Sequence, residues 1–214
     1  MTNARIQYYL TVANEITPSS RNPYALCKEL EIEIINNCAL HKDAYFVCQE
    51  GLKLIFVNSC IKNWHRRKFV TAHEIGHYFL HQDKLYCCNN ISEINLSSSI
   101  KVNSSSQEYE ANTFASEYVL PTSLLQEKLP NREIHFSDIF TIANEFDVSV
   151  TLTAMKSIQY SKTESESLLC YENNRLKWFA FSNNDDMDKS AVPSLCPFDS
   201  LLCSQSTDIT GYWD

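Results

Sequence analysis

The segment His73-Glu74-Ile75-Gly76-His77 has the residue types and the spacing of a metal-dependent hydrolytic site. Histidines four residues apart on a helix project from adjacent turns of one face, with Cβ atoms roughly 5 to 6 Å apart, so both rings can bind one zinc ion. Glu74 follows about 100° round the helix, where it flanks the ion and can take a proton from water. The segment therefore predicts a zinc site with Glu74 as its general base. The alternative is a coincidental pattern on a core helix.

A further ligand must come from elsewhere, because catalytic zinc usually has three protein ligands and an open fourth position. On a helix predicted over residues 107 to 120, Glu108 falls on a small, apolar stripe, whereas Glu110 and Glu117 point to the opposite side. An ionised carboxylate on a core-facing stripe is costly unless it is paired or binds a metal. Glu108 is thus the predicted third ligand. Otherwise it only begins the helix, where negative charge is favourable.

Asn112 and His81 are predicted to lie around the metal. Asn112 stands one turn after Glu108 and can accept a hydrogen bond from the outer ring nitrogen of a bound histidine. His81 follows His77 by four residues but has rotated about 80° from the first histidine, which suits an outer contact, a substrate contact or a surface position. Peptide hydrolysis also needs a donor for the developing oxyanion. The candidate donors or substrate contacts are His81, Tyr118, Arg132 and His135.

The elements that position these residues are of mixed type. Short helices are predicted at residues 4 to 13 and 23 to 30, and strands at 31 to 35, 44 to 48 and 52 to 57. A turn at 49 to 51 makes these strands a small antiparallel sheet. A helical period then runs from 64 to 81. Gly76 inside this helix costs about 1 kcal/mol relative to alanine, which indicates close approach of another backbone.

The later part of the chain predicts further helices and a small sheet. Residues 82 to 106 are a long polar stretch, typical of a mobile loop, and a short helix is expected through 124 to 128. Residues 138 to 158 predict a helical hairpin, and 168 to 171 with 176 to 181 predict two strands joined at Asn173-Asn174. The fold class is therefore α+β. We expect one domain over residues 1–160 and a small region of unknown role over 165–214.

Composition limits the classes of function. Hydrophobic residues make up 44% of the 214 residues and charged residues 21%, as in ordinary globular proteins. The net charge of -8 repels phosphate backbones and anionic lipids, so no direct nucleic-acid or membrane partner is expected. The N-terminus lacks a secretory signal and no segment approaches about 18 apolar residues, so we expect a cytoplasmic protein. The nine cysteines, without a Cys-x-x-Cys pair, are interpreted as reduced, buried thiols.

Two sequence blocks carry a specific resemblance. The segment from Phe69 to His81, and the one from Glu108 to Pro121, resemble in order and spacing the ImmA/IrrE family of zinc peptidases. The resemblance implies a gluzincin-like fold, in which the sheet packs on a zincin-like helical core. It also implies one zinc ion held by His73, His77 and Glu108, with Glu74 as base. Family members cleave helix-turn-helix repressors in phage, mobile-element or stress regulation, so a repressor protein is the expected substrate.

Two other classes of function stay open at this stage. Residues 139 to 154 resemble a helix-turn-helix, which would make the chain a transcription regulator. However, the would-be recognition segment, Ser149 to Ser157, offers only Lys156 as a cation, and DNA recognition needs clustered basic residues. The second alternative is a zinc-binding interaction module that cuts nothing. Glu74 argues against it, because metal retention alone does not require that carboxylate.

Overall fold

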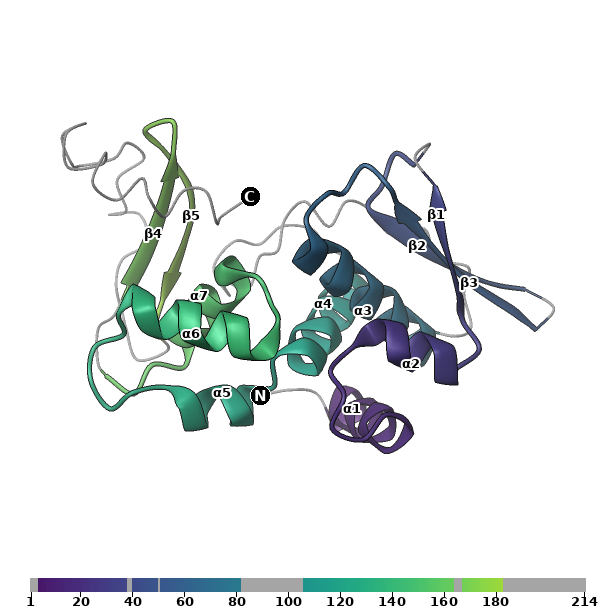
Figure 1. Ribbon diagram of the computed structural model, residues 1–214, viewed down its shortest axis with the longest axis horizontal. Coiled ribbons are helices and arrows are strands. Elements are labelled where there is room, and N and C mark those ends of the chain that lie inside the picture. Colours follow the sequence, from purple (N-terminus) through teal and green to yellow (C-terminus); the bar gives the residue numbers. More distant parts are fainter. Residues whose placement is uncertain (1–3, 38–39, 50, 82–105, 164–166, 183–214) are drawn as a thin grey trace. The chain divides into compact units, whose positions relative to one another are not determined.

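The computed structural model describes residues 4–37, 40–49, 51–81, 106–163 and 167–182 (Figure 1). The chain divides into two compact units, residues 1–94 with 102–121 and residues 95–101 with 122–214. Most of the predicted polar loop at residues 82 to 106 lies outside the described residues. Within the described parts, no helix has the length and apolarity that membrane crossing requires. In these parts, blocks of helices and two small sheets make up an α+β fold, as predicted.

The first unit contains a three-stranded sheet with the order β1-β3-β2. Its strands are β1 (Glu33–Asn37), β2 (Ala44–Gln49) and β3 (Leu52–Asn58). Strands β2 and β3 are antiparallel, as predicted, but β1 is parallel to β3. The expected purely antiparallel sheet is therefore wrong, and the sheet is mixed. Strand β3 lies between β1 and β2, which follow each other in the sequence but do not pair. This central position agrees with the full burial of Ile55 and Val57 on β3.

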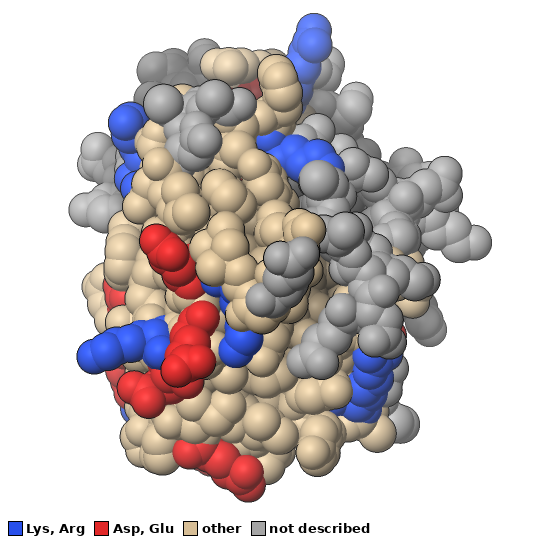
Figure 2. Space-filling model, turned by 90° about the vertical axis from the view of Figure 1, so that its right-hand side faces the viewer, with Lys and Arg blue, Asp and Glu red and all other residues tan. Residues whose placement is uncertain are grey.

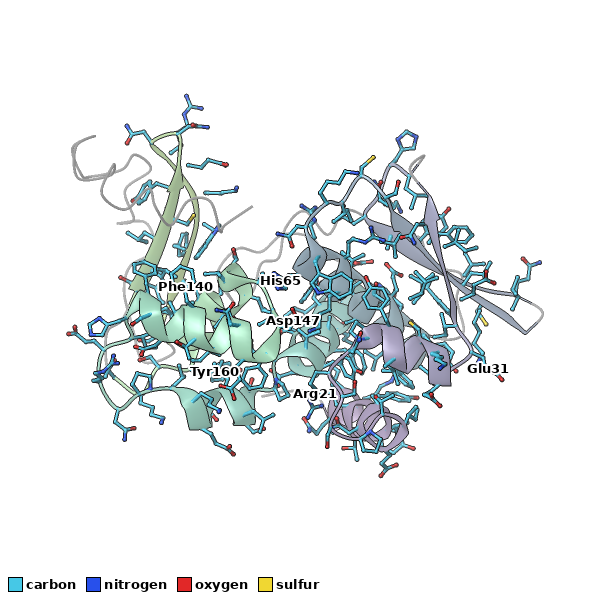
Figure 3. All side chains as sticks on the ribbon, in the orientation of Figure 1. Arg21, Glu31, His65, Phe140, Asp147 and Tyr160 are labelled. Atoms are coloured by element: carbon cyan, nitrogen blue, oxygen red, sulfur yellow. The ribbon has the colours of Figure 1, made fainter. Side chains whose placement is uncertain are left out.

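The described residues of the first unit also form the helices α1 (Ala4–Ile16), α2 (Pro23–Glu29), α3 (Trp64–Leu80) and α4 (Ser106–Val119). Helix α2 begins as predicted, because the Asn22 side chain accepts a hydrogen bond from the Tyr24 amide and Pro23 occupies the first turn. Glu31, labelled in Figure 3, has φ 55° and turns the chain from α2 towards β1. Helix α3 contacts α1, α2, α4, β2 and β3, so it is the centre of this unit.

Helix α3 is buried around its whole circumference over much of its length. Every residue from 68 to 77 is buried. The single apolar stripe that the sequence predicts is therefore only part of the helix surface that packs, since the sheet and the helices cover it from several directions. Polar side chains on this segment lie in a dry environment, where each needs a hydrogen-bond or metal partner.

The second unit comprises α5 (Thr122–Lys128), α6 (Phe136–Phe146), α7 (Val150–Gln159), β4 (Ser167–Glu172) and β5 (Arg175–Phe181). The predicted hairpin turn is confirmed, since Asn173 and Asn174 both have positive φ, at 50° and 64°. Ala180 on β5 packs with Met155 and Ile158 of α7. The domain boundary predicted between residues 160 and 165 stays a prediction.

Helices α6 and α7 form the predicted helical hairpin. Asp147, labelled in Figure 3, ends α6 in the left-handed region, and Ser149 caps α7 by accepting from the Leu152 amide. Helix α7 is buried from 152 to 158, and Lys156 is only 1% exposed. A DNA-recognition helix must present its cations to phosphates and bases. The burial of α7 therefore favours a packing role.

The face that Figure 2 shows, which is the right-hand side of Figure 1, lacks the charge pattern of a nucleic-acid interface. There, the described Lys and Arg side chains stand apart from one another among acidic and uncharged residues. They form no continuous basic patch on this face. Nucleic-acid binding relies on such a patch, because phosphate contacts supply most of the non-specific affinity.

The cysteines in the described residues depart in part from the sequence interpretation. All four are free thiols. Cys27 is buried, and burial raises its pKa to about 12, so it is inert as a nucleophile. Cys170 is half-buried, while Cys48 and Cys60 are exposed. The prediction of buried thiols is thus right for Cys27 and wrong for the two exposed cysteines, whose strand end and loop positions place them at the surface.

Gly76 is the point where α3 and α4 come closest. A Cβ atom at this position would lie 3.1 Å from the Ala111 Cα atom, 3.2 Å from the Ala111 carbonyl oxygen and 3.2 Å from the Phe114 ring. Two of these atoms belong to the α4 backbone, so the helix itself would have to move. The close approach predicted from a glycine inside the helix is confirmed.

We expect Gly76→Ala to destabilise the fold, although alanine alone would favour the helix by about 1 kcal/mol. Overpacking against a neighbouring backbone costs about 1 to 3 kcal/mol, so a net loss of up to about 2 kcal/mol is predicted. Urea unfolding of the metal-free protein measures it. A variant more stable than the wild type would contradict the close approach.

Candidate metal centre

Helix α3 carries the two candidate ligand histidines into the core. Asn63 begins the helix by accepting a hydrogen bond from the Arg66 amide at 2.9 Å. At the other end, the His81 amide bonds to the His77 carbonyl, and the Arg5 guanidinium of α1 donates to the Leu80 carbonyl. The helix is thus held at both ends while its middle is buried.

Three side chains from α3 and α4 converge. His73 Nε2 lies 3.1 Å from His77 Nε2, and the two oxygens of Glu108 lie 3.4 Å from His73 Nε2 and 3.6 Å from His77 Nε2. Both histidines are buried, and the Glu108 side chain is 15% exposed. In the described part of the chain, this trio is the group of His, Cys, Asp and Glu residues arranged to hold a metal ion.

The spacing of these donor atoms fits a tetrahedral zinc ion. Donors about 2.0 to 2.1 Å from zinc in a tetrahedral site lie about 3.3 to 3.4 Å apart, close to the three distances seen here. Two imidazoles and one carboxylate are also a donor set that catalytic zinc uses. The residues present therefore fit the metal that the sequence predicts.

The outer ring nitrogens of both histidines have hydrogen-bond partners. His73 Nδ1 lies 2.9 Å from Asn112 Oδ1, so the structure places Asn112 where the sequence predicted it. His77 Nδ1 lies 2.9 Å from His81 Nδ1. Since the outer nitrogen of each ring is occupied, Nε2 is the atom that each ring presents to the centre of the trio.

Glu108 is ionised in this environment. Burial raises the pKa of its carboxyl, but the hydrogen bonds and charges of His73 and His77 act more strongly in the opposite direction, so the pKa lies well below its usual value. A carboxylate is the form that binds a cation. Those hydrogen bonds and charges require protons on the two histidine rings, which a bound metal ion displaces.

Glu74 is fully buried, directly after the first histidine on α3. A residue directly after a ligand on a helix lies about 100° round from it, so we expect Glu74 to flank the trio and not to donate to the ion. A buried carboxyl next to a metal site is the arrangement that a general base requires.

His81 and Glu110 form a contact that the sequence interpretation missed. His81 Nε2 lies 3.0 Å from Glu110 Oε2, and His81 is buried. Burial lowers the pKa of His81, although its bond to Glu110 acts in the other direction. The helical wheel predicted Glu110 on the far side of α4, but it gives only the direction of the Cα–Cβ bond. A long glutamate side chain and an imidazole ring can still meet.

The other residues predicted as oxyanion donors or substrate contacts have structural partners. Tyr118 is fully buried, stacks on Phe114 and donates to the Asn22 carbonyl at 3.4 Å, so it has a packing role in α4. A contact of Tyr118 with substrate stays a prediction. His81 uses both ring nitrogens, as described above.

Arg132 and His135 belong to the second unit. Arg132 makes two bonds to Asp138, at 2.8 and 3.0 Å, and Asp138 also accepts from the His135 amide at the start of α6. These contacts give both residues a local role at the beginning of a helix. Their contribution to a site stays a prediction.

Comparison with known proteins agrees with the geometry. Residues 27–157, more than half of the chain, match the peptidase family described as the IrrE N-terminal-like domain. The chain belongs to this IrrE-like peptidase family. The match includes α3 and α4, and hence every residue of the trio.

A curated relative strengthens the assignment. The metallopeptidase ImmA of Bacillus subtilis (strain 168) is 33% identical over 116 residues, which cover 53% of this chain and 63% of the relative. The chain thus spans less than two thirds of that relative's length. The resemblance to the ImmA/IrrE family that the two sequence blocks predicted is confirmed, and membership of this metallopeptidase family implies a metal cofactor.

We expect His73→Ala and Glu108→Ala each to lower zinc affinity more than about 100-fold, because each removes one of the converging donors and losing even an outer contact costs about 10- to 100-fold. Glu117→Ala, which removes a carboxylate two turns along α4 from Glu110, is the control and should retain zinc. Metal analysis after dialysis measures the zinc content. Full zinc in Glu108→Ala would show that another residue is the third ligand.

Proposed function

We propose that this chain is a zinc-dependent endopeptidase with a single metal ion held by His73, His77 and Glu108. The observation that carries the proposal is the convergence of two imidazole nitrogens and one carboxylate at distances of 3.1 to 3.6 Å. The buried Glu74 beside them adds the base that hydrolysis needs. Membership of a metallopeptidase family supports the same reaction.

The chemistry divides between the ion and the chain's own residues. Zinc, when bound, supplies a Lewis acid that polarises a carbonyl and makes water more acidic. Glu74 accepts the proton of the attacking water and returns it to the amine that leaves. Asn112 accepts the hydrogen bond of His73 Nδ1 and so keeps the ring oriented towards the site.

The proposed substrate is a repressor protein of the helix-turn-helix class, cleaved at a specific bond in the cytoplasm, with an anti-repressor role in phage, mobile-element or stress regulation. The resemblance to the ImmA/IrrE family supports this class of substrate. The net charge of -8 also supports it, because DNA-binding repressors carry clustered basic residues, and opposite charges speed encounter between two proteins.

Two other functions would use the same fold differently. A zinc-binding module that only holds a partner would not need Glu74, and a carboxyl in the core is costly to keep. A helix-turn-helix regulator would need an exposed basic α7, whereas α7 is buried and Lys156 with it. Both therefore rank below the peptidase.

The substitution Glu74→Gln tests the proposed reaction. It removes the base but keeps the size and shape of the side chain, so zinc content should stay near that of the wild type. Cleavage of a candidate repressor encoded beside this protein should fall about 100- to 10,000-fold, the range expected for a lost general base. The measurements are metal analysis and the rate of product formation on gels.

Glu117→Gln, a matched change on α4, serves as the control and should cleave at the wild-type rate. Wild-type cleavage by Glu74→Gln would exclude the general base assigned here. If neither the wild type nor Glu74→Gln cleaves the repressor and both still have the same biological effect, the protein is an interaction module. Specific retardation of DNA by the purified protein would instead favour the regulator.

A further inference from the structure

A chain of hydrogen-bonded side chains runs from the trio into α4. It begins at His77 Nδ1, which lies 2.9 Å from His81 Nδ1, and continues from His81 Nε2 to Glu110 Oε2 at 3.0 Å. The side chains of His77 and His81 are 1% and 3% exposed, and that of Glu110 is 19% exposed. The chain is therefore shielded from water over most of its length.

The chemistry of each contact determines where the protons lie. An ionised carboxylate only accepts hydrogen bonds, so His81 Nε2 must carry a proton and donate it to Glu110. In a neutral imidazole the other nitrogen, Nδ1, then has a lone pair and accepts. The facing nitrogen, Nδ1 of His77, must donate. It follows that, when His77 is neutral, its Nε2 has a lone pair that faces Glu108 and His73.

We propose that Glu110 and His81 are positioning residues, which together fix the tautomer of His77 that can bind the metal. This inference rests on the proposed metal site and adds two residues to it. Glu110 reaches the ligand only through His81, and it contributes a negative charge at the end of the chain. Such a partner orients the ring and makes its Nε2 a stronger donor.

The two ligand histidines thus obtain the same tautomer from different partners. His73 relies on Asn112, a neutral acceptor on α4. His77 Nδ1 instead meets His81, which lies one turn further along α3. The His81 ring can either donate to His77 Nδ1 or accept from it. It therefore fixes the tautomer of His77 only when the second nitrogen of His81 has a hydrogen-bond partner of fixed role. Glu110 provides that restraint.

The end of α3 holds His81 in place. His81 is the residue at which the helix stops, with φ -137° and ψ 34°, and its amide still bonds to the His77 carbonyl. Arg5 donates to the Leu80 carbonyl beside it. The backbone around His81 is therefore fixed from α1, and the ring is held between His77 and Glu110.

The simpler interpretation is that His81 and Glu110 only link α3 to α4. A structural link would affect stability without changing where the proton of His77 lies. The distinguishing quantity is the tautomer of His77, which nitrogen-15 NMR of histidine-labelled protein reports directly. The full chain is measured both zinc-loaded and after removal of zinc with a chelator.

In the metal-free wild type, we expect His77 to carry its proton on Nδ1. In Glu110→Ala, His81 loses its restraint, so His77 should become a mixture of both tautomers. Zinc affinity, measured against a chromophoric chelator, should fall about 10- to 100-fold. Glu110→Gln should restore both readouts to near wild type, because its amide oxygen can still accept from His81. Glu117→Ala is the control and should change neither.

An unchanged His77 tautomer in Glu110→Ala would overturn the proposal, and so would a wild type in which His77 carries its proton on Nε2. If Glu110→Ala does not fold, His81→Ala provides the same readout, since it removes the acceptor itself. A wild type that binds no zinc but shows the tautomer change would refute the proposed function and leave this inference standing. A wild type that binds zinc, together with a Glu110→Ala variant whose His77 tautomer is unchanged, would refute this inference and leave the proposed function standing.

Discussion

The close approach of α3 and α4 at Gly76 is the constraint on which the site depends. With no side chain at this position, the α4 backbone at Ala111 comes into direct contact with α3. Glu108 lies one turn before Ala111 and Asn112 directly after it, so a single crossing point brings the carboxylate to 3.4 Å and the amide oxygen to 2.9 Å from the same histidine. Wider spacing of the two helices would separate the donors from one another.

Because the imidazoles are buried at this crossing, their ring nitrogens need partners from within the protein or from a metal ion. A polar ring in a dry core must have partners for both nitrogens, because an unsatisfied group there costs about 1 to 3 kcal/mol. The outer nitrogens meet Asn112 and His81, and the inner nitrogens face each other with Glu108. Two lone pairs and a carboxylate repel one another unless a cation lies between them. The same contacts that satisfy the fold therefore create a site for a metal.

Features set by local geometry could be predicted from the sequence. The four-residue spacing of the histidines, the stripe that holds Glu108 and the acceptor role of Asn112 all follow from helical rotation, and Gly76 indicated the crossing. Features set by long-range packing could not. The parallel pairing of β1 depends on which strand becomes central, and the hydrogen bond of Tyr118 to the Asn22 carbonyl joins residues far apart in the chain. The contact of His81 with Glu110 depends on side-chain reach across two helices, which a helical wheel does not contain.

X-ray absorption spectroscopy at the zinc edge of the purified full chain tests the central claim most directly, because it identifies the atoms bound to the ion. The account predicts only nitrogen and oxygen neighbours at about 2.0 to 2.2 Å, with the scattering pattern of two imidazoles. Sulfur at about 2.3 Å would show that some of the nine cysteines hold the metal and would contradict it.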